Sequence, residues 1–75
     1  MRELLSHMIQ GITGKKCEIS EENSNGFVVF KLNVPQEDVG LIIGRSGKTI
    51  NAIKNILKII AIRDGVRVDV QVEEA

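Results

Sequence analysis

The feature that most constrains the fold of this chain is an apolar run interrupted by two glycines three residues apart, Val39-Gly40-Leu41-Ile42-Ile43-Gly44-Arg45-Ser46-Gly47-Lys48-Thr49-Ile50. Pro35 fixes φ and lacks an N–H, so it suits the first turn of a helix. In that helix Val39, Ile42 and Ile43 share one face. Gly44 is where a left-handed backbone costs least, so the helix can end there. The stretch predicts a short helix, a tight turn through Arg45-Ser46 and a second helix from Gly47.

The second helix begins with the wrong charge for a helix N-terminus. Arg45 and Lys48 stand where the helix dipole favours Asp or Glu. Every charged residue between Val39 and Arg63 is basic, namely Arg45, Lys48, Lys54, Lys58 and Arg63. An anionic ligand would relieve this arrangement, because free N–H groups around Gly47 attract a phosphate that the two cations neutralise. We therefore predict a nucleic-acid backbone clamp at Gly44 to Gly47, where a Cβ would hold the phosphate away.

Composition places any nucleic-acid binding in this local cluster. Seventy-five residues make one domain, residues 1–75, and ten basic residues balance ten acidic ones to a formal net charge of zero. The single cysteine, Cys17, excludes an internal disulfide and a metal cluster, so we expect a buried, small apolar side chain there. His7 has no second histidine or matching cysteine, and we expect it in solvent.

Two other signals are missing from the sequence. No apolar segment approaches the length of a membrane span, and the N-terminus lacks the apolar core and cleavage site of a leader. We therefore expect a cytoplasmic protein that does not bind membranes. No paired carboxylates, no Ser or Cys beside a histidine and no metal-ligand spacing are found, so we expect neither an enzyme nor a cofactor.

Periodicity predicts the other elements. Residues 2–13 have the apolar spacing of a helix, whose apolar face consists of Leu4, Leu5, Met8, Ile9 and Ile12. Strands are predicted over 15–20, 27–34 and 66–73, with a turn over 21–26 and a helix over 47–63. The order is α-β-β-α-α-β, and the one-sided alternation of the last strand indicates helices packed on one face of a three-stranded sheet. The fold class is therefore α+β.

The long helix has two distinct faces. Its predicted apolar stripe consists of Ile50, Ile53, Ile56, Leu57 and Ile60. The opposite stripe consists of Lys48, Asn51, Lys54, Asn55 and Lys58, and its freedom from carboxylates favours a binding face over an ordinary solvated one. Ile59 and Ile62 fall outside the core stripe and suit contact with another element or a partner. Core packing explains Phe27 and Phe30, although an exposed phenylalanine could also stack on a base.

The segment Ile42-Ile43-Gly44-Arg45-Ser46-Gly47-Lys48-Thr49-Ile50 resembles the I-I-G-x-x-G-x-x-I signature of the KH RNA-binding domain. The element order is similar to the type II, prokaryotic arrangement. A chain that is little more than one such domain resembles the small bacterial single-KH proteins of the KhpA (YlqC-type) family. Ser46 departs from the family pattern by leaving one cation rather than two in the turn. The resemblance covers the whole chain.

The resemblance implies a groove that holds about four single-stranded nucleotides, with the backbone on Gly44 to Gly47 and the bases on an apolar floor. It implies that Gly40 lets the groove wall approach the strand, and that Asn51 and Lys54 reach the sugar-phosphate edge. Leu41, Ile43 and Ile50 suit the floor as well as the core. Family members act as RNA chaperones or regulators and associate with themselves or with a second KH-containing protein. RNA is the expected ligand, with single-stranded DNA as an alternative.

Two rival functions fit parts of the same stretch. A P-loop nucleotide site would need a glycine five residues before Gly47, where the chain has Ile42, and 75 residues are few for the usual sheet. A protein-interaction module without nucleic-acid binding is the second rival, favoured by Ile59, Ile62 and the zero net charge. Reversing the charge of the turn separates it from an RNA-binding function.

Overall fold

The computed structural model describes residues 1–74 and has the predicted order of elements. They are α1 (Arg2–Thr13), β1 (Glu18–Ser24), β2 (Phe27–Val34), α2 (Gln36–Ile43), the single 3-10 turn η1 (Arg45–Gly47), α3 (Lys48–Asp64) and β3 (Arg67–Glu74). The three strands form one sheet in the order β1-β2-β3. β2 pairs antiparallel with β1 and parallel with β3, so α2 and α3 form the crossover between the two parallel strands.

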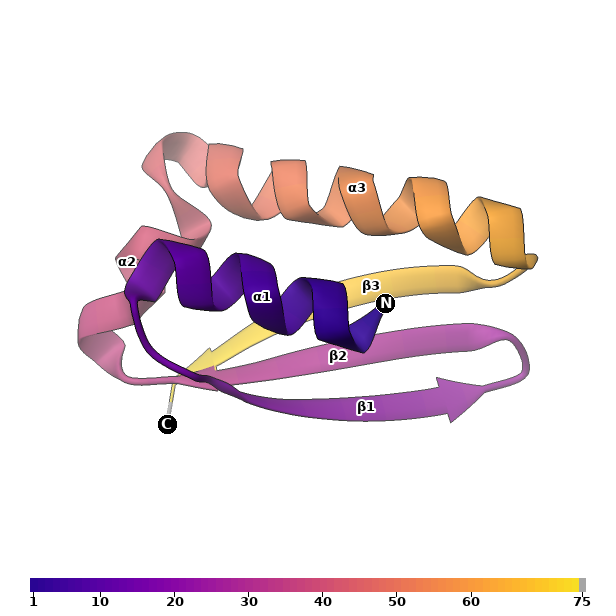
Figure 1. Ribbon diagram of the computed structural model, residues 1–75, viewed down its shortest axis with the longest axis horizontal. Helices are drawn as coiled ribbons and strands as arrows, with labels where there is room; N and C mark the ends of the chain where they lie inside the picture. The colour runs from indigo at the N-terminus through magenta and orange to yellow at the C-terminus, as the bar shows by residue number, and fades with distance from the viewer. Residues whose placement is uncertain (75) are drawn as a thin grey trace.

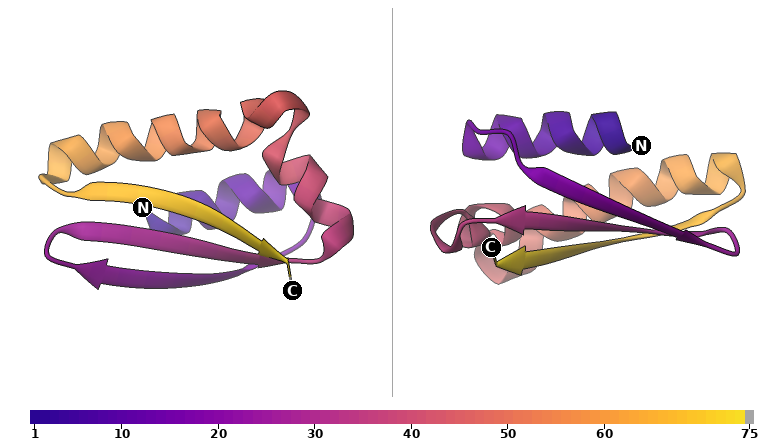
Figure 2. Two further views of the ribbon diagram at one scale, coloured as in Figure 1. Left: turned by 180° about the vertical axis from the view of Figure 1, so that it is seen from behind. Right: turned by 90° about the horizontal axis from the view of Figure 1, so that it is seen from below.

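The helices cover one face of this sheet, as predicted (Figure 1). α1 packs against β1, and α3 runs above β3 on the same face. α2 lies at one end of the sheet, where β2 ends. The opposite face of the sheet carries no helix, as the view from below shows (Figure 2). This arrangement confirms the α+β architecture.

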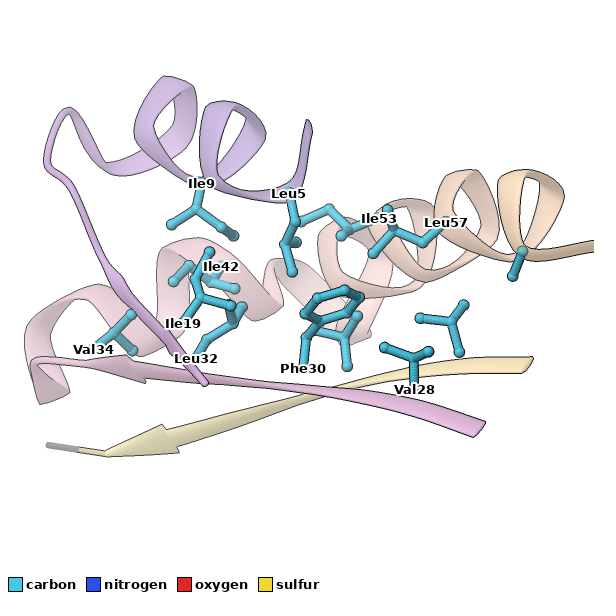
Figure 3. Packing of buried hydrophobic residues seen from close by; sticks show 13 residues of the cluster. Leu5, Ile9, Ile19, Val28, Phe30, Leu32, Val34, Ile42, Ile53 and Leu57 are labelled. Carbon is cyan, nitrogen blue, oxygen red and sulfur yellow. The ribbon is translucent and has the colours of Figure 1, made fainter. Parts of the chain in front are cut away.

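The core fills the space between the sheet and the helices (Figure 3). β2 supplies four alternate side chains, Val28, Phe30, Leu32 and Val34, all of them buried. The largest fully buried side chain is Phe30. Because side chains alternate along a strand, Val29 and Lys31 lie between these residues on the other side and are only half-buried. Fully burying one large apolar side chain stabilises the fold by about 1.5–3 kcal/mol. The four buried side chains of β2 therefore contribute much of the energy that holds the helices on the sheet.

The first hairpin is tighter than predicted. The prediction placed a strand over 15–20 and a turn over 21–26, but β1 extends to Ser24 and pairs with β2 as far as Ser24↔Phe27. Only Asn25 and Gly26 form the turn, with φ of 49° and 79°, which suits the two-residue Asn-Gly hairpin. The polar run Glu21–Ser24 is a strand because its partner β2 pairs with it, and its side chains remain exposed.

The apolar stripe of α3 is rotated relative to the prediction. The buried residues are Ile53, Leu57 and Ala61, whereas Ile56 is 43% exposed. Ala61 belongs to the core because a small side chain lets the helix approach β3. Leu4 of α1 is likewise 38% exposed rather than buried. The apolar faces of both helices are therefore narrower than their isoleucine and leucine content suggested.

A polar contact fixes α2 at the end of the sheet. The Lys15 ammonium lies 3.2 Å from a carboxylate oxygen of Glu37 and 3.2 Å from one of Asp38. Asp38 is buried, so this pairing satisfies a carboxylate that the sequence did not mark as internal. Hydrogen bonds to Glu37 and then Asp38 raise the pKa of Lys15. The α1–β1 connection thus holds the helix that leads into the glycines.

Cys17 is half-buried rather than fully buried, and it packs against the core. Its thiol donates to the carbonyl of Asn33 at 3.3 Å, and burial raises its pKa. His7 is exposed, as expected. Within residues 1–74, no helix has the length and apolar character to cross a membrane, and no group of acidic, His or Cys side chains is placed to hold a metal ion.

Candidate nucleic-acid interface

The turn from Gly44 to Gly47, called here the glycine turn, joins α2 to α3 at the end of the molecule farthest from the β1–β2 hairpin (Figure 1). It projects away from the sheet, and the view from behind shows the same projection (Figure 2). Arg45 and Ser46 are exposed, and the flanking glycines are half-buried. The turn is therefore open to a ligand from outside the fold.

The backbone of the glycine turn needs glycine at one position for two reasons. Gly44 has φ 75° and ψ 176°, a region that residues with a Cβ almost never adopt. A Cβ there would also collide with the side chain of Thr49, 2.8 Å from its Cβ, and with the Thr49 amide nitrogen at 2.9 Å. Thr49 thus occupies the space that Gly44 leaves free. No local sequence pattern indicates this contact.

The other two residues of the glycine turn with positive φ are less constrained. Gly47 has φ 75° and ψ 13°, and a Cβ there would meet only Asn51 Nδ2, at an ordinary 3.7 Å. Ser46 has φ 57°, a left-handed conformation that is uncommon for a residue with a side chain. The chain therefore reverses through left-handed residues after α2 and enters α3 at Lys48.

The amides of the turn divide into bonded and free donors. Gly44 N–H donates to Gly40 O at 2.9 Å, Gly47 N–H donates to Gly44 O at 3.3 Å, and Lys48 N–H donates to Arg45 O. Within residues 1–74, the amides of Arg45 and Ser46 have no backbone acceptor. The sequence placed free donors around Gly47, and these two amides lie just before it in the same turn.

The charge around these free amides is positive. Arg45 and Lys48 are both exposed, and the first turn of α3 has no acidic residue. No side chain caps the N-terminus of α3, whose N-cap residue is Gly47. An uncapped helix N-terminus carries about half a positive charge, which adds to the two cations. The site can accept an anion such as a phosphate, and within the described residues none of its side chains is paired with an acid.

Asn51 and Lys54 lie further along α3 and differ in their surroundings. Asn51 is exposed one turn after Gly47, beside the turn. The Lys54 ammonium lies 3.6 Å from a carboxylate oxygen of Asp69 in β3. The sequence alone predicts that the polar stripe of α3, which includes Lys54, is free of carboxylates. The strand brings this acid across from a distant part of the chain. Because both partners are partly exposed, the pair is weak, and Lys54 can still exchange partners with a phosphate.

The wall beside the glycine turn is formed by α2. Gly40 is exposed, and a Cβ added there would meet nothing within 4 Å. Packing within the fold therefore does not explain this glycine in the interior of a helix. Leu41 is 53% exposed, whereas Ile43 and Ile50 are half-buried. Leu41 is thus the most accessible of the three residues predicted for an apolar floor.

The local structure contradicts a P-loop. In a P-loop the residues before the glycines form a strand, but here Gln36–Ile43 is helix α2. The strand that precedes the turn, β2, is separated from it by the whole of α2. The glycine turn is a helix–turn–helix element.

Comparison with known proteins gives a consistent family. The family model described as "KhpA/KhpB, KH domain" matches residues 2–72. A curated relative from Chlamydia trachomatis serovar D, named RNA-binding protein KhpA, is 33% identical over 76 residues, which cover 99% of this chain and 97% of that protein. Proteins of the same name from Thermotoga maritima and Clostridium acetobutylicum are 37% and 27% identical. The match to the Thermotoga maritima protein covers 76% of this chain and 79% of that protein. The match to the Clostridium acetobutylicum protein covers 96% of this chain and 99% of that protein.

Proposed function

Because the chain belongs to the KhpA/KhpB family of KH domains, we propose that it is an RNA-binding protein that holds a short single-stranded RNA segment on the glycine turn. The observation that carries this proposal is the pair of free amides at Arg45 and Ser46, exposed beside two cations at an uncapped helix N-terminus. Relatives of similar length that are named RNA-binding proteins support RNA as the ligand.

The proposed mechanism is backbone recognition. A phosphate of the strand accepts hydrogen bonds from the amides of Arg45 and Ser46, and Arg45 and Lys48 neutralise its charge. The neighbouring sugar-phosphate groups lie along Asn51 and Lys54, and Lys54 exchanges Asp69 for a phosphate. The bases turn toward Leu41, with Ile43 and Ile50 behind it. Gly40 leaves room for the strand against α2.

The proposed cellular role is that of an RNA chaperone or post-transcriptional regulator in the cytoplasm. Catalysis has no part in this role, because the contacts only position the strand. A single KH domain binds few nucleotides and therefore weakly. We propose that a second copy of the chain, or another KH-containing protein, raises the affinity through effective concentration.

A titration of the unmodified chain with short labelled RNA tests the proposal. About three neutralised phosphates predict a slope near −2 when the logarithm of the association constant is plotted against the logarithm of salt concentration. Fluorescence anisotropy at several salt concentrations measures this slope, and single-stranded DNA of the same sequence serves as the comparison. Absence of saturable binding at low salt would mean that the domain is a protein-interaction module instead.

Gly40→Ala separates ligand contact from folding. Alanine in a helix interior is about 0.5–1 kcal/mol more favourable than glycine, and an added Cβ meets nothing in the fold, so this variant should be more stable. It should nevertheless bind RNA more weakly, by about three- to tenfold, because the methyl group holds the strand off α2. Chemical denaturation and anisotropy give the two readouts.

Gly11→Ala is the matched control for this pair of measurements. Gly11 is an exposed helical glycine of α1 with nothing within 4 Å of an added Cβ, and it lies outside the proposed groove. It should show the same gain in stability with unchanged RNA affinity. If Gly40→Ala behaves like Gly11→Ala in both measurements, α2 does not form the groove wall.

A further inference from the structure

An apolar pocket at the other end of α3 is unexplained by the glycine turn. It is lined by Phe27, Ala61, Ile62, Val66 and Val68, with Lys58 and Arg67 also contributing, and its volume is about 260 Å³. Two of its apolar side chains are open to solvent, since Phe27 is 41% exposed and Ile62 is 77% exposed. We call it the Phe27 pocket.

The Phe27 pocket and the glycine turn lie on one continuous face of α3. Residues spaced three and four apart share a helix face, and Lys48, Asn51, Asn55, Lys58 and Ile62 follow this spacing. All five are exposed. The Lys54–Asp69 pair places the flank of α3 that borders this ridge beside β3. The view from behind shows α3 running from the glycine turn to the α3–β3 connection, where it meets the start of β3 (Figure 2).

The charge at the Phe27 pocket favours an anionic strand. Neither Lys58 nor Arg67 forms an ion pair within the described part of the chain. Asp64, the one carboxylate of α3, lines a separate recess together with Glu3 and Glu21. The two recesses at this end of the molecule therefore differ in charge, and the basic one continues the ridge.

The size of the pocket and its aromatic residue suit one nucleobase. Pockets for drug-sized ligands measure about 300–1,000 Å³, so this smaller one suits a single ring system rather than a nucleotide cofactor. An exposed phenylalanine is the standard partner for a splayed-out base, because every base presents a π-face. A second recess shares Phe27, Val66 and Arg67, so Phe27 stands between two hollows.

From these observations we propose that the Phe27 pocket is a second RNA subsite, in which one base of the strand held by the glycine turn stacks on Phe27 while Lys58 and Arg67 contact its phosphates. This inference rests on the proposed RNA-binding function. A helix rise of about 1.5 Å per residue puts Ile62 about 22 Å beyond Gly47, which about seven stacked nucleotides at about 3.4 Å each would span. Four nucleotides at the turn and seven along the ridge fit within a 12-mer.

Fluorescence of Phe27→Trp tests the proposal, since the chain has no other tryptophan and no tyrosine. A 12-nucleotide RNA should quench this tryptophan, and a 4-nucleotide RNA should leave its emission unchanged. Leu4→Trp is the matched control, because Leu4 is 38% exposed on α1, away from the ridge, and neither RNA should quench it. Phe27→Leu should weaken binding of the 12-mer by about 5- to 100-fold and leave binding of the 4-mer as it is.

Three outcomes would overturn the proposal, and they are distinguishable. If the chain binds both RNAs but Phe27→Leu binds the 12-mer as well as the unmodified chain does, the pocket is not a subsite and the glycine turn remains one. If the emission of the Phe27→Trp variant changes with protein concentration alone, a second copy of the chain occupies the pocket. If the unmodified chain binds neither RNA, the proposed function fails and this inference fails with it.

Discussion

Gly44→Ala is expected to lower the free energy of unfolding by about 3 kcal/mol. A residue with a Cβ held at φ 75° and ψ 176° costs of order 1–3 kcal/mol, and the collision with Thr49 adds an overpacking cost of similar size. Small domains have a total stability near the lower end of about 5–15 kcal/mol, so a large share is lost. Urea unfolding followed by circular dichroism measures the change.

Gly47→Ala is the control for Gly44→Ala. Its φ is also 75°, but an added Cβ meets only Asn51 Nδ2 at 3.7 Å, so the left-handed backbone alone should cost about 1–2 kcal/mol. The difference between the two variants reports the combined cost of the ψ of 176° at Gly44 and of the contact with Thr49. Equal losses would mean that neither constrains the turn.

Most of the fold could be predicted from the sequence because the hydrophobic periodicity agreed with the positions of the residues that end helices and strands. Residues 2–13 and 27–34 were predicted with the bounds that α1 and β2 have, and the glycines at 44 and 65 mark where α2 and α3 end. The strict alternation after Gly65 identified β3 to within one residue. Each of these elements has a local signal that its tertiary surroundings reinforce.

The errors arose where a partner element decides the outcome. Glu21–Ser24 has the composition of a turn, but its pairing with β2 makes it a strand. The helical period alone could not distinguish Ile56 from Ala61, because the tilt of α3 on β3 selects which side is buried. Asp69 was also beyond prediction as a partner of Lys54, since the two residues meet only in the folded sheet.

At the candidate site, the sequence located the glycines and cations, and the structure shows their backbone geometry. The pattern of glycines and cations located the turn, and all its residues lie together in the structure. In the structure the amides of Arg45 and Ser46 have no backbone acceptor within the described residues. Thr49, which makes Gly44 obligatory, had no sequence signal because nothing local indicates that its side chain folds back on the glycine.

Arg45→Asp combined with Ser46→Asp is expected to abolish RNA binding without harming the fold. The double variant replaces a cation and a neutral side chain with carboxylates at the proposed phosphate position. Loss of one charged contact costs about 1.5–3 kcal/mol, and repulsion adds to it, so affinity should fall at least about 100-fold. Aspartate tolerates the left-handed backbone of Ser46 and suits the N-terminus of α3, so stability should be maintained or raised.

Lys16→Asp combined with Ser20→Asp controls for total charge. Both positions are exposed and lie outside the glycine turn, and this variant loses the same net charge as the turn variant. If the turn binds the strand, the control should retain RNA affinity to within a few-fold. Its residual change reports the long-range electrostatic effect alone.

The decisive measurement is the affinity of the unmodified chain and the two charge variants for one short single-stranded RNA, at one low salt concentration, with unfolding curves recorded on the same samples. We expect the turn variant to lose at least about 100-fold in affinity while remaining folded, and the control variant to bind nearly as the unmodified chain does. Equal affinity of the turn variant and the control would contradict the assignment of the free amides at Arg45 and Ser46 to a phosphate.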